Sequence, residues 1–169
     1  ADLVKALPRG LGDMTVGVVG LGTIGLDVAS AFHRMGARIV YFDPAPRDPD
    51  AAAAIGAESV DLETLLATAD VVTLHVPLLP ATTGLIGAAE LALMKPDAVL
   101  IHASRGGIVD EAALAAALSE GAIAGAAVDV YAQEPPAADH PLFTLDDAAS
   151  DRLILTPHIG GVTRQAWAT

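Results

Sequence analysis

Short runs of apolar residues recur along the chain, separated by polar segments or by segments with helical spacing. The runs are four or five residues long and nearly all apolar, rather than alternating between apolar and polar positions. Such runs are typical of strands that are buried on both faces of a sheet. The pattern therefore predicts six strands, at residues 15–19, 38–42, 71–75, 98–102, 125–129 and 153–156.

Helical segments lie between these predicted strands. Apolar residues recur at helical spacing after residue 23, and Gly36 ends that segment. Asp61 and Asp110 are suited to cap helices that run to about residue 67 and over residues 111–120, because an aspartate side chain accepts a hydrogen bond from the first helical turn. Further helices are predicted at residues 51–54 and 88–94 and from Thr163 onward, and loops at residues 44–50 and 132–150.

Strands that alternate with helices along a chain indicate a parallel sheet, because a parallel connection needs a crossover that a helix supplies. We therefore expect an α/β fold of the Rossmann type. It would be a doubly wound parallel sheet of about six or seven strands, with helices on both faces. At 169 residues the chain suits one domain with a sizeable core.

A glycine-rich turn follows the first predicted strand directly. It reads Gly20-Leu21-Gly22-Thr23-Ile24-Gly25, and a helical segment starts within it. In a dinucleotide-binding unit the first glycine permits the tight turn, the second lets the backbone approach the pyrophosphate, and the third lets helix and strand pack closely. The helix N-terminus presents unpaired N–H groups to the phosphates. Asp43 ends the second predicted strand eighteen residues after Gly25, near the spacing of an acid that binds the adenosine ribose.

Glycine-rich turns are common, so the same residues also fit an ordinary strand-to-helix turn in which Asp43 merely opens a turn with Pro44. The strand before the turn, the helix after it and the acid at the end of the next strand favour dinucleotide binding. The carboxylate of Asp43 favours NAD, because it would repel the 2′-phosphate of NADP. Arg47 lies nearby and leaves NADP as the less favoured cofactor.

Composition and charge exclude several other classes of protein. The net charge of −12 disfavours a nucleic-acid partner, because like charges repel. No apolar stretch approaches the roughly 18 residues of a membrane span, and the start of the chain lacks a signal-peptide pattern, so we expect no membrane partner and a cytoplasmic protein. The absence of cysteine removes disulfide bonds and thiolate zinc sites. No histidine pair has metal-ligand spacing, so no metal site is expected.

Polar residues that can do chemistry follow the last three predicted strands. Arg105 follows the fourth strand, Glu134 lies beyond the fifth, and His158 follows the sixth. Ligands bind at the carboxyl ends of the strands in such a sheet, so these side chains are expected near one another. Each also has an ordinary interpretation: Arg105 as a surface ion-pair residue, Glu134 as plain loop and His158 as the cap of a turn. His75 and His102, at strand ends, are interpreted from position alone as packed structural residues.

Four further segments occur in order behind the glycine-rich turn. They read HVPLLPATTGLI (75–86), HASRGGIVDEAAL (102–114), DVYAQEPP (129–136) and TPHIGG (156–161). Together with GLGTIG they closely resemble the NAD-binding domain of the D-isomer-specific 2-hydroxyacid dehydrogenases, the family that includes phosphoglycerate, glycerate and D-lactate dehydrogenases. The resemblance covers roughly residues 15–166.

The resemblance implies that the chain binds NAD(H) and takes part in hydride transfer to or from a small 2-hydroxy or 2-keto acid. The implied catalytic residues are Arg105, which binds the substrate's carboxylate and carbonyl, His158, the acid/base, and Glu134, which pairs with His158. The implied cofactor-binding residues are Gly20, Gly22, Thr23, Ile24 and Gly25 at the pyrophosphate, Asp43 at the adenosine ribose, His75, Val76, Pro77 and Thr82 on the adenosine side, and Ala103, Ser104, Arg105, Asp129, His158, Gly160 and Gly161 around the nicotinamide.

The chemistry of these side chains fits the implied roles. Hydride transfer to a keto acid needs a proton at the carbonyl oxygen, and histidine titrates in the range required. A carboxylate behind the ring stabilises the imidazolium. A guanidinium can bind a carboxylate through two hydrogen bonds where a lysine cannot. The cofactor carries the hydride, while the protein supplies placement and charge.

Two features depart from the family pattern. The family usually has asparagine where this chain has His102, which affects hydrogen bonding close to Arg105. In the family, a second domain for the substrate is built from sequence on both sides of this one, whereas here only 19 residues precede Gly20 and eight follow Gly161. We therefore interpret residues 1–169 as a cofactor domain without its substrate domain, and we expect the isolated domain to be inactive or weakly active.

The resemblance also suggests a homodimer joined through this domain in the longer enzyme. An alternative function is a non-catalytic NAD-sensing or corepressor-like scaffold module, because such proteins can retain Arg105, Glu134 and His158. Formate dehydrogenase is a related alternative, which would need residues of a substrate domain that this chain does not show.

Overall fold

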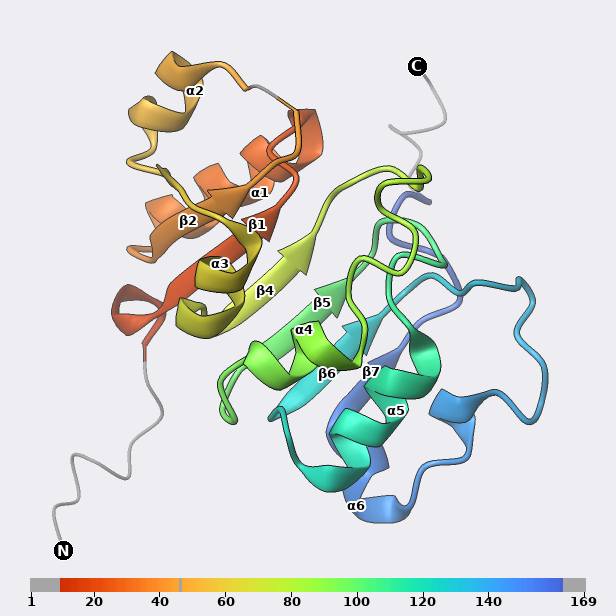
Figure 1. Ribbon diagram of the computed structural model, residues 1–169. Coiled ribbons are helices and arrows are strands. Elements are labelled where there is room, and N and C mark those ends of the chain that lie inside the picture. The colour runs from red at the N-terminus through yellow and green to blue at the C-terminus, as the bar shows by residue number, and fades with distance from the viewer. Residues whose placement is uncertain (1–9, 46, 163–169) are drawn as a thin grey trace, which may run out of the picture.

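The computed structural model describes residues 10–45 and 47–162, which form a seven-stranded parallel sheet flanked by helices (Figure 1). The strands are β1 Thr15–Val19, β2 Arg38–Phe42, β3 Glu58–Ser59, β4 Val71–Leu74, β5 Val99–His102, β6 Gly125–Val128 and β7 Leu153–Leu155. They lie in the order β3-β2-β1-β4-β5-β6-β7. The chain runs outward from β1 in one direction and from β4 in the other, so the carboxyl ends of β1 and β4 mark the switch point where such sheets bind ligands.

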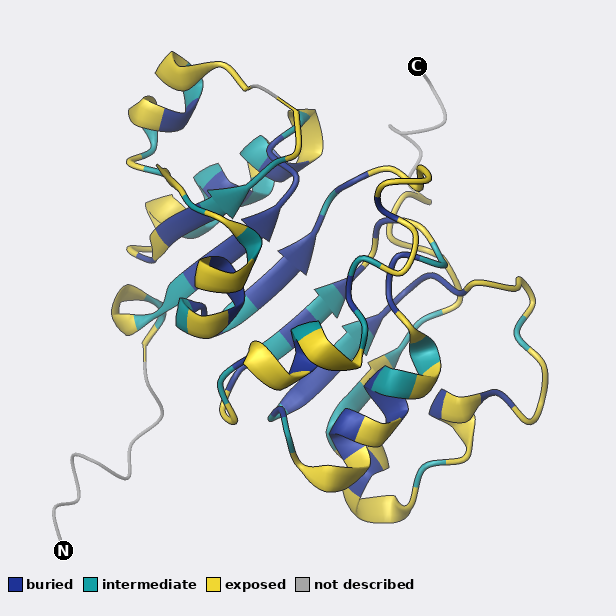
Figure 2. Cartoon of the chain, in the orientation of Figure 1, coloured by how far each residue is buried: buried dark blue, intermediate teal, exposed yellow. Residues whose placement is uncertain are grey.

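The central strands β1 and β4 are almost entirely buried (Figure 2). Val18 of β1 pairs in register with Tyr41 of β2 and with Thr73 of β4. Full burial of a valine or leucine side chain contributes roughly 1.5–3 kcal/mol relative to an exposed one. The nearly continuous apolar runs are therefore explained by packing on both faces, and the predicted doubly wound parallel sheet is confirmed.

Helices cover the two faces of the sheet in separate groups. α1 (Thr23–Arg34) packs on β1 and β2, and α3 (Leu62–Thr68) packs on the same two strands from the other face. Next to α3 lies α4 (Ala88–Leu93), and next to α4 lies α5 (Glu111–Glu120), so these three helices form one layer. The right-handed crossovers of parallel strands account for this division, because the two halves of the sheet run in opposite directions from the centre. The shorter helices are α2 Pro49–Ala54, α6 Asp147–Ser150, η2 Leu11–Asp13 and η3 Pro141–Phe143.

Two hydrophobic clusters correspond to these two faces. Val16 and Val18 of β1 pack with Ala29 of α1 in one cluster. Val72 of β4 packs with Leu65 of α3 in the other, larger cluster, which extends under α4 and α5. Alternate residues of the strands thus point to opposite helical layers, as the period of two along a strand requires.

The helix caps that the sequence predicts are present. The Asp61 side chain accepts a hydrogen bond from the Thr64 N–H at 2.7 Å. The Asp110 side chain accepts from the N–H groups of Ala112 and Ala113, both at 3.0 Å. Gly121 ends α5 with φ +69°, a left-handed conformation that glycine adopts without a steric penalty.

Several elements differ from the sequence prediction. The two-residue strand β3 (Glu58–Ser59) has exposed polar side chains, so it carries no apolar run that would reveal it. α2 begins at Pro49 instead of residue 51, because the Asp48 side chain caps it by accepting from the Asp50 N–H at 3.0 Å. The predicted loop 132–150 contains η3 and α6, which are too short to show helical periodicity. The helix predicted from Thr163 lies outside the described residues.

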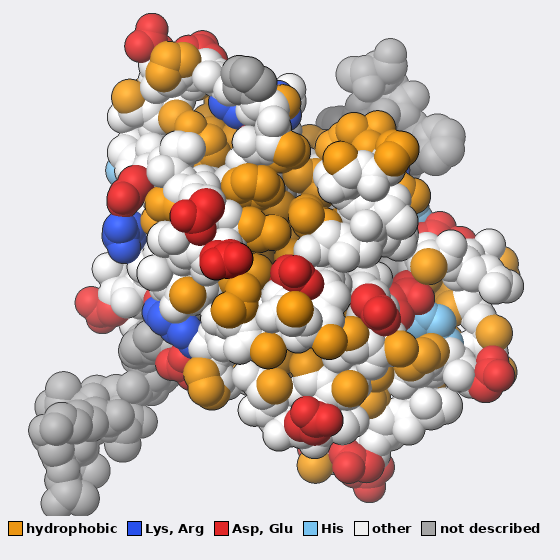
Figure 3. Space-filling model, in the orientation of Figure 1, with side chains coloured by type: hydrophobic (Ala, Val, Ile, Leu, Met, Phe, Trp, Pro, Cys, Tyr) orange, Lys and Arg blue, Asp and Glu red, His pale blue; other side chains and the backbone are white. Residues whose placement is uncertain are grey.

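Acidic side chains are spread over the face of the molecule seen in Figure 3, in line with the net charge of −12. In residues 10–45 and 47–162, no helix has the length and apolar character needed to span a membrane. The same residues contain no cluster of three histidine or carboxylate side chains arranged to hold a metal ion.

Candidate active site

The glycine-rich turn lies at the carboxyl end of β1, and close approach of the backbone accounts for two of its glycines. Gly20 has φ +96°, and a Cβ atom there would lie 2.8 Å from the backbone of His75. A Cβ atom on Gly25 would lie 1.9 Å from the Gly20 carbonyl oxygen. The first and third glycines therefore allow helix α1 to begin directly against the turn.

Gly22 differs from the other two glycines, because a Cβ atom on it would meet no heavy atom within 4 Å. It is the N-cap of α1, and no side chain caps the helix there. The N–H groups of the first turn are therefore available to an anion, and the helix dipole favours negative charge at this end. Ile24, also in this turn, is 69% exposed. Nothing in the fold itself requires glycine at position 22.

Asp43 lies at the carboxyl end of β2 and is tied to the glycine-rich turn. Its Oδ2 accepts a hydrogen bond from the Leu21 N–H at 2.7 Å, and its Oδ1 accepts from the Ala45 N–H at 2.9 Å. Burial alone would raise the pKa of Asp43, but hydrogen bonds from Arg47, Ala45 and Leu21 outweigh burial and lower it. Asp43 is therefore an anion held in place beside the turn.

Arg47 forms a two-point ion pair with the same carboxylate. Its Nε donates to Oδ2 of Asp43 at 2.5 Å, and its Nη2 donates to Oδ1 at 3.1 Å. With the two backbone N–H groups, each carboxylate oxygen of Asp43 accepts two hydrogen bonds, and the Asp43 side chain is only 2% exposed. This pairing raises the pKa of Arg47. The sequence placed Arg47 near the site but did not predict this contact.

A cavity of about 260 Å³ connects the turn to the loop after β5. Its lining residues are Ile24, His75, Val76, Pro77, Ala103, Ser104 and Arg105. Burial lowers the pKa of His75, whose Nε2 lies 2.9 Å from Oγ1 of Thr73. Three residues predicted on the adenosine side and three predicted around the nicotinamide thus line one crevice.

Thr82 does not line this cavity. It is buried, and its hydroxyl donates to the Pro77 carbonyl at 2.5 Å and accepts from the Leu79 N–H at 2.8 Å. The hydroxyl therefore holds the loop that contains Pro77. Thr82 thus acts on the adenosine side of the crevice by fixing Pro77, which lines it.

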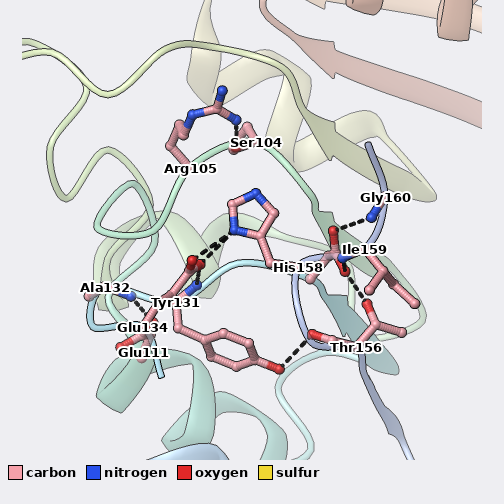
Figure 4. Close-up of polar contacts among 11 residues, drawn as sticks. Ser104, Arg105, Glu111, Tyr131, Ala132, Glu134, Thr156, His158, Ile159 and Gly160 are labelled. Atoms are coloured by element: carbon pink, nitrogen blue, oxygen red, sulfur yellow. Dashed lines mark hydrogen bonds and ion pairs between the residues drawn. The ribbon is translucent and has the colours of Figure 1, made fainter. Parts of the chain in front are cut away.

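His158 and Glu134 meet at the carboxyl ends of β6 and β7 (Figure 4). Nδ1 of His158 lies 2.8 Å from Oε2 and 2.9 Å from Oε1 of Glu134. The hydrogen bond with His158, followed by one from the Tyr131 N–H at 3.1 Å, lowers the pKa of Glu134. The two side chains are 43% and 38% exposed, so the pair faces solvent. In the described part of the chain, only Nδ1 of the imidazole is engaged, and Nε2 is left for a ligand.

The backbone of His158 adopts a left-handed conformation, with φ +55°. Among the described residues it is the one non-glycine residue with positive φ, a conformation that is uncommon outside glycine. Such conformations persist where the surroundings enforce them and are frequent at functional sites. Here the surroundings are the turn of residues 156–160.

Asp129 holds that turn. Its Oδ1 accepts hydrogen bonds from the Thr156 hydroxyl and from the Ile159 N–H, the latter at 2.9 Å, and its Oδ2 accepts from the Gly160 N–H at 2.8 Å. Burial alone would raise the pKa of Asp129, but these hydrogen bonds outweigh it and lower the pKa. Asp129 and Gly160, predicted around the nicotinamide, are thus bonded to each other and position the turn of His158. Among the described residues, no heavy atom lies within 4 Å of a Cβ atom built on Gly161.

Arg105 lies in the loop after β5. Its Nη1 donates to the Ser104 carbonyl at 2.6 Å, and the guanidinium is turned toward that carbonyl and makes no hydrogen bond to His158 or Glu134 (Figure 4). Next to it, a Cβ atom on Gly106 would lie 1.8 Å from the Tyr131 carbonyl oxygen. The loop of Arg105 therefore packs directly on the loop that carries Glu134.

His102 is buried at the end of β5, and its Nδ1 lies 3.4 Å from the Ser104 hydroxyl. Burial lowers its pKa from 6.5 to about 4, and the charge of Glu111 acts weakly in the opposite direction. The ring is therefore neutral in the folded protein near pH 7. This geometry agrees with the interpretation of His102 as a packed structural residue.

Sequence reasoning missed a set of residues behind the pair. The carboxylate of Glu111 contacts the Ala132 N–H and the ring of His140. The hydroxyl of Tyr131 donates to the Thr156 carbonyl. Glu111 stands inside a segment quoted for the family resemblance, directly after a helix cap, which is the one signal that could have pointed to it. An apolar cavity of about 340 Å³, bordered by the rings of Tyr131 and Phe143 and by three prolines, opens beside the pair.

Comparison with known proteins gives a consistent result. Residues 4–160 match the family model described as "D-isomer specific 2-hydroxyacid dehydrogenase, NAD binding domain". Over 152 residues the chain is 44% identical to D-3-phosphoglycerate dehydrogenase of Archaeoglobus fulgidus, covering 90% of this chain and 28% of that protein. Over 160 residues it is 46% identical to glyoxylate reductase of Thermococcus litoralis, covering 95% of this chain and 46% of that protein.

Among solved structures, the fold is similar to that of the NAD-complexed D-isomer specific 2-hydroxyacid dehydrogenase from Lactobacillus delbrueckii ssp. bulgaricus. The TM-score is 0.84 at 33% sequence identity, with 96% of this chain and 51% of that chain covered. The chain thus spans between 28% and 51% of the length of these relatives.

Proposed function

Because this chain belongs to the D-isomer-specific 2-hydroxyacid dehydrogenase family and matches its NAD-binding domain, we propose that it is the cofactor-binding part of an enzyme that transfers a hydride between NAD(H) and a small D-2-hydroxy or 2-keto acid. The observation that carries this proposal is the contact of 2.8 Å between Nδ1 of His158 and Glu134. The loop of Glu134 packs on the loop of Arg105, and Arg105 lines the crevice that begins at the glycine-rich turn. The alternative of a non-catalytic module is not favoured, since the relatives named above are a dehydrogenase and a reductase.

The residues present fit a dinucleotide. The uncapped N-terminus of α1 suits the pyrophosphate, since no heavy atom of residues 10–45 and 47–162 lies within 4 Å of a Cβ atom built on Gly22. Asp43 is proposed for the adenosine ribose, whose hydroxyl would take the place of the Arg47 Nη2 bond of 3.1 Å on Oδ1, and Ala103 and Ser104 are proposed for the nicotinamide. When bound, NADH supplies the hydride, and the protein supplies position and charge.

The acid–base work falls to His158. With Nδ1 facing Glu134, Nε2 is the atom that gives a proton to the carbonyl oxygen of a keto acid, or takes one from a hydroxy acid. The Glu134 carboxylate holds the ring in one orientation and stabilises its protonated form. Arg105 would turn its guanidinium from the Ser104 carbonyl to the substrate carboxylate, where two parallel hydrogen bonds are possible.

NAD is proposed as the cofactor in preference to NADP. A 2′-phosphate at the ribose would lie against the Asp43 carboxylate, which is anionic and fully hydrogen-bonded. Arg47, the cation nearest that position, has both arms of its guanidinium committed to Asp43. Replacing Asp43 by asparagine removes the repulsion and frees Arg47, so the preference for NADH over NADPH is expected to shrink.

The domain organisation is also proposed from the comparisons. Residues 1–169 would form the cofactor domain of a longer, cytoplasmic enzyme, and other sequence would form its substrate domain. This proposal is supported by the lengths of the two curated relatives described above, because the chain covers only 28% and 46% of them. A homodimer joined through this domain is the proposed assembly.

Binding and activity measurements test these proposals in sequence. Calorimetry of the chain with NADH and NADPH is expected to give binding in the micromolar to millimolar range, tighter for NADH; no binding at millimolar NADH would overturn the cofactor role. With the flanking sequence restored, reduction of small 2-keto acids by NADH is expected. His158→Ala should lower kcat roughly 10²–10⁴-fold, the usual contribution of a general acid, while NADH binding by the same variant stays within a few-fold and serves as the control.

A further inference from the structure

The side chain of Glu134 needs support from outside its own loop. It lies on a long connection between β6 and η3 in which residues 132–135 and 137–139 are exposed, and no strand or helix contains it. Yet its carboxylate is held within 3 Å of His158. An exposed loop does not fix a side chain to that accuracy unless specific contacts order it, because loops of this kind are otherwise mobile.

Glu111 supplies two such contacts. It is the first residue of α5, and the two oxygens of its carboxylate bond to different parts of the loop. Oε1 accepts a hydrogen bond from the Ala132 N–H at 2.8 Å, and Oε2 lies 3.0 Å from Nε2 of His140. One carboxylate therefore joins two points that are eight residues apart, and Glu134 lies between them.

The geometry at His140 defines which nitrogen carries the proton. Nδ1 of His140 accepts a hydrogen bond from the Leu142 N–H at 3.3 Å, so the proton is on Nε2 and points at Glu111. The ring is buried and lies edge-on to the ring of Tyr131, at a centroid separation of 5.7 Å and an interplanar angle of 89°. His140 is thus anchored on both edges, and it anchors the far end of the loop.

Tyr131 connects this part of the loop to the proposed catalytic pair. Its N–H donates to Oε1 of Glu134 at 3.1 Å, and its hydroxyl donates to the Thr156 carbonyl at 3.0 Å. Thr156 precedes His158 by two residues, so Tyr131 contacts the segments of both partners. Figure 4 shows Glu111, Ala132 and Tyr131 grouped behind Glu134, on the side away from Arg105.

We propose that Glu111, acting through His140 and the Ala132 N–H, is a positioning residue that holds the carboxylate of Glu134 behind the imidazole of His158. The proposal rests on the proposed function of that pair as the acid–base centre. It adds a residue on α5, far along the chain, that touches neither cofactor nor substrate. Its test follows the state of Glu134 itself, so it does not depend on cofactor binding or on turnover.

The test is a titration of the Glu134 side-chain carboxyl by ¹³C NMR in the chain as it stands, with the signal assigned by its loss in Glu134→Gln. The groups that act on Glu134 are His158 and the Tyr131 N–H, which lower its pKa, and Asp129, which raises it. In Glu111→Ala the loop is released, so the pKa of Glu134 is expected to rise toward its ordinary value. Direct loss of the Glu111 negative charge acts in the opposite direction, because removing a like charge lowers a carboxyl pKa.

His140→Asn is the second variant, and it keeps the Glu111 charge. The asparagine oxygen can still accept from the Leu142 N–H, but its shorter side chain no longer reaches Glu111. The same rise in the Glu134 pKa is expected. Glu120→Gln is the matched control, since it removes a carboxylate from the exposed far end of the same helix and should leave the Glu134 titration unchanged. Because His140→Asn keeps the Glu111 charge, an unchanged or lowered pKa of Glu134 in this variant would overturn the proposal.

Discussion

The glycine-rich turn and Asp43 lie within one β–α–β unit, whereas Arg105, Glu134 and His158 come from three separate loops. On the proposed nucleotide side, these contacts stay within that one unit: the Gly20 N–H donates to the Phe42 carbonyl at 2.8 Å and the Leu21 N–H donates to Asp43 at 2.7 Å. On the proposed acid–base side, the contacts join residues of separate loops, as between His158 and Glu134 and between Gly160 and Asp129. The first half is thus one continuous unit of the sheet, and the second is held together by side chains that bond from one loop to another.

This difference has a structural consequence. The nucleotide half is held by the central strands, which are buried on both faces. The acid–base half depends on a few polar side chains, chiefly Asp129 and Glu111, whose oxygens accept backbone N–H groups. We expect the two halves to respond separately to substitution, and the following experiments measure how separate they are.

The largest effects are expected from alanine at two glycines, one in each half. In Gly25→Ala the new Cβ would lie 1.9 Å from the Gly20 carbonyl oxygen, and in Gly106→Ala it would lie 1.8 Å from the Tyr131 carbonyl oxygen. Both contacts are with backbone, so each variant should lose at least the roughly 1–3 kcal/mol that overpacking typically costs. Urea unfolding measures this loss.

Binding of ADP-ribose separates the two variants. This ligand has the adenosine and pyrophosphate of NAD but no nicotinamide. Gly25→Ala should abolish its binding, while Gly106→Ala, once folded, should bind within a few-fold of the original chain. Gly10→Ala is the control for both, because its Cβ would meet no heavy atom within 4 Å. Equal loss of ADP-ribose binding in both variants would show that the halves are not independent.

The second effect concerns two histidines, His75 on the nucleotide side, which is partly buried, and His102 on the acid–base side, which is buried. Burial lowers the pKa of both. In the range between the folded and unfolded pKa values the unfolded chain binds more protons, so the free energy of unfolding rises with pH. For His102 the pKa falls from 6.5 to about 4, which corresponds to on the order of 3 kcal/mol at about 1.4 kcal/mol per pKa unit. Stability from this source is complete above about pH 6.5 and is lost as pH falls toward 4.

Asparagine, which is usual in the family at position 102, tests this at both positions. His102→Asn should remove most of the loss in unfolding free energy between pH 7 and pH 4.5, measured by urea unfolding at both values. His75→Asn should remove less, because the ring of His75 is only partly buried. A wild-type pH dependence in His102→Asn contradicts the assignment of the acid sensitivity to the acid–base half.

The same contrast explains what the sequence alone could predict. The spacing between the glycine-rich turn and Asp43 predicted that Gly20 and Asp43 lie close together, because the two strands of a β–α–β unit have their carboxyl ends at the same edge of the sheet. The order of the strands predicted only that Glu134 and His158 lie near one another, and their direct pairing was implied by the family resemblance, since no motif spacing relates residues of two separate loops.

Three contacts escaped both approaches. The Arg47 guanidinium donates to the Asp43 carboxylate, and the Asp129 carboxylate accepts hydrogen bonds from N–H groups of the turn that contains His158. The Glu111 carboxylate contacts the ring of His140. Each depends on the rotamer of a polar side chain, which apolar periodicity and motif spacing do not report. Thr82 is a related case, because a motif match predicted that it lines the crevice, whereas its hydroxyl bonds within its own loop.

The smallest effect on the fold is expected for Gly22→Ala, which should nevertheless weaken cofactor binding. The backbone of Gly22 is extended, with φ −71°, and its Cβ would enter open space. Alanine is a poorer N-cap than glycine, but it also restricts the unfolded chain, and these two effects of about 0.5 kcal/mol oppose each other. The unfolding free energy should therefore change little. The methyl group would stand where a pyrophosphate approaches the first turn of α1, so the Kd for NADH should rise about tenfold, or about 1.4 kcal/mol. Unchanged affinity in a folded Gly22→Ala would mean that the dinucleotide does not cross the turn, and the nucleotide half of the site would have to be placed elsewhere.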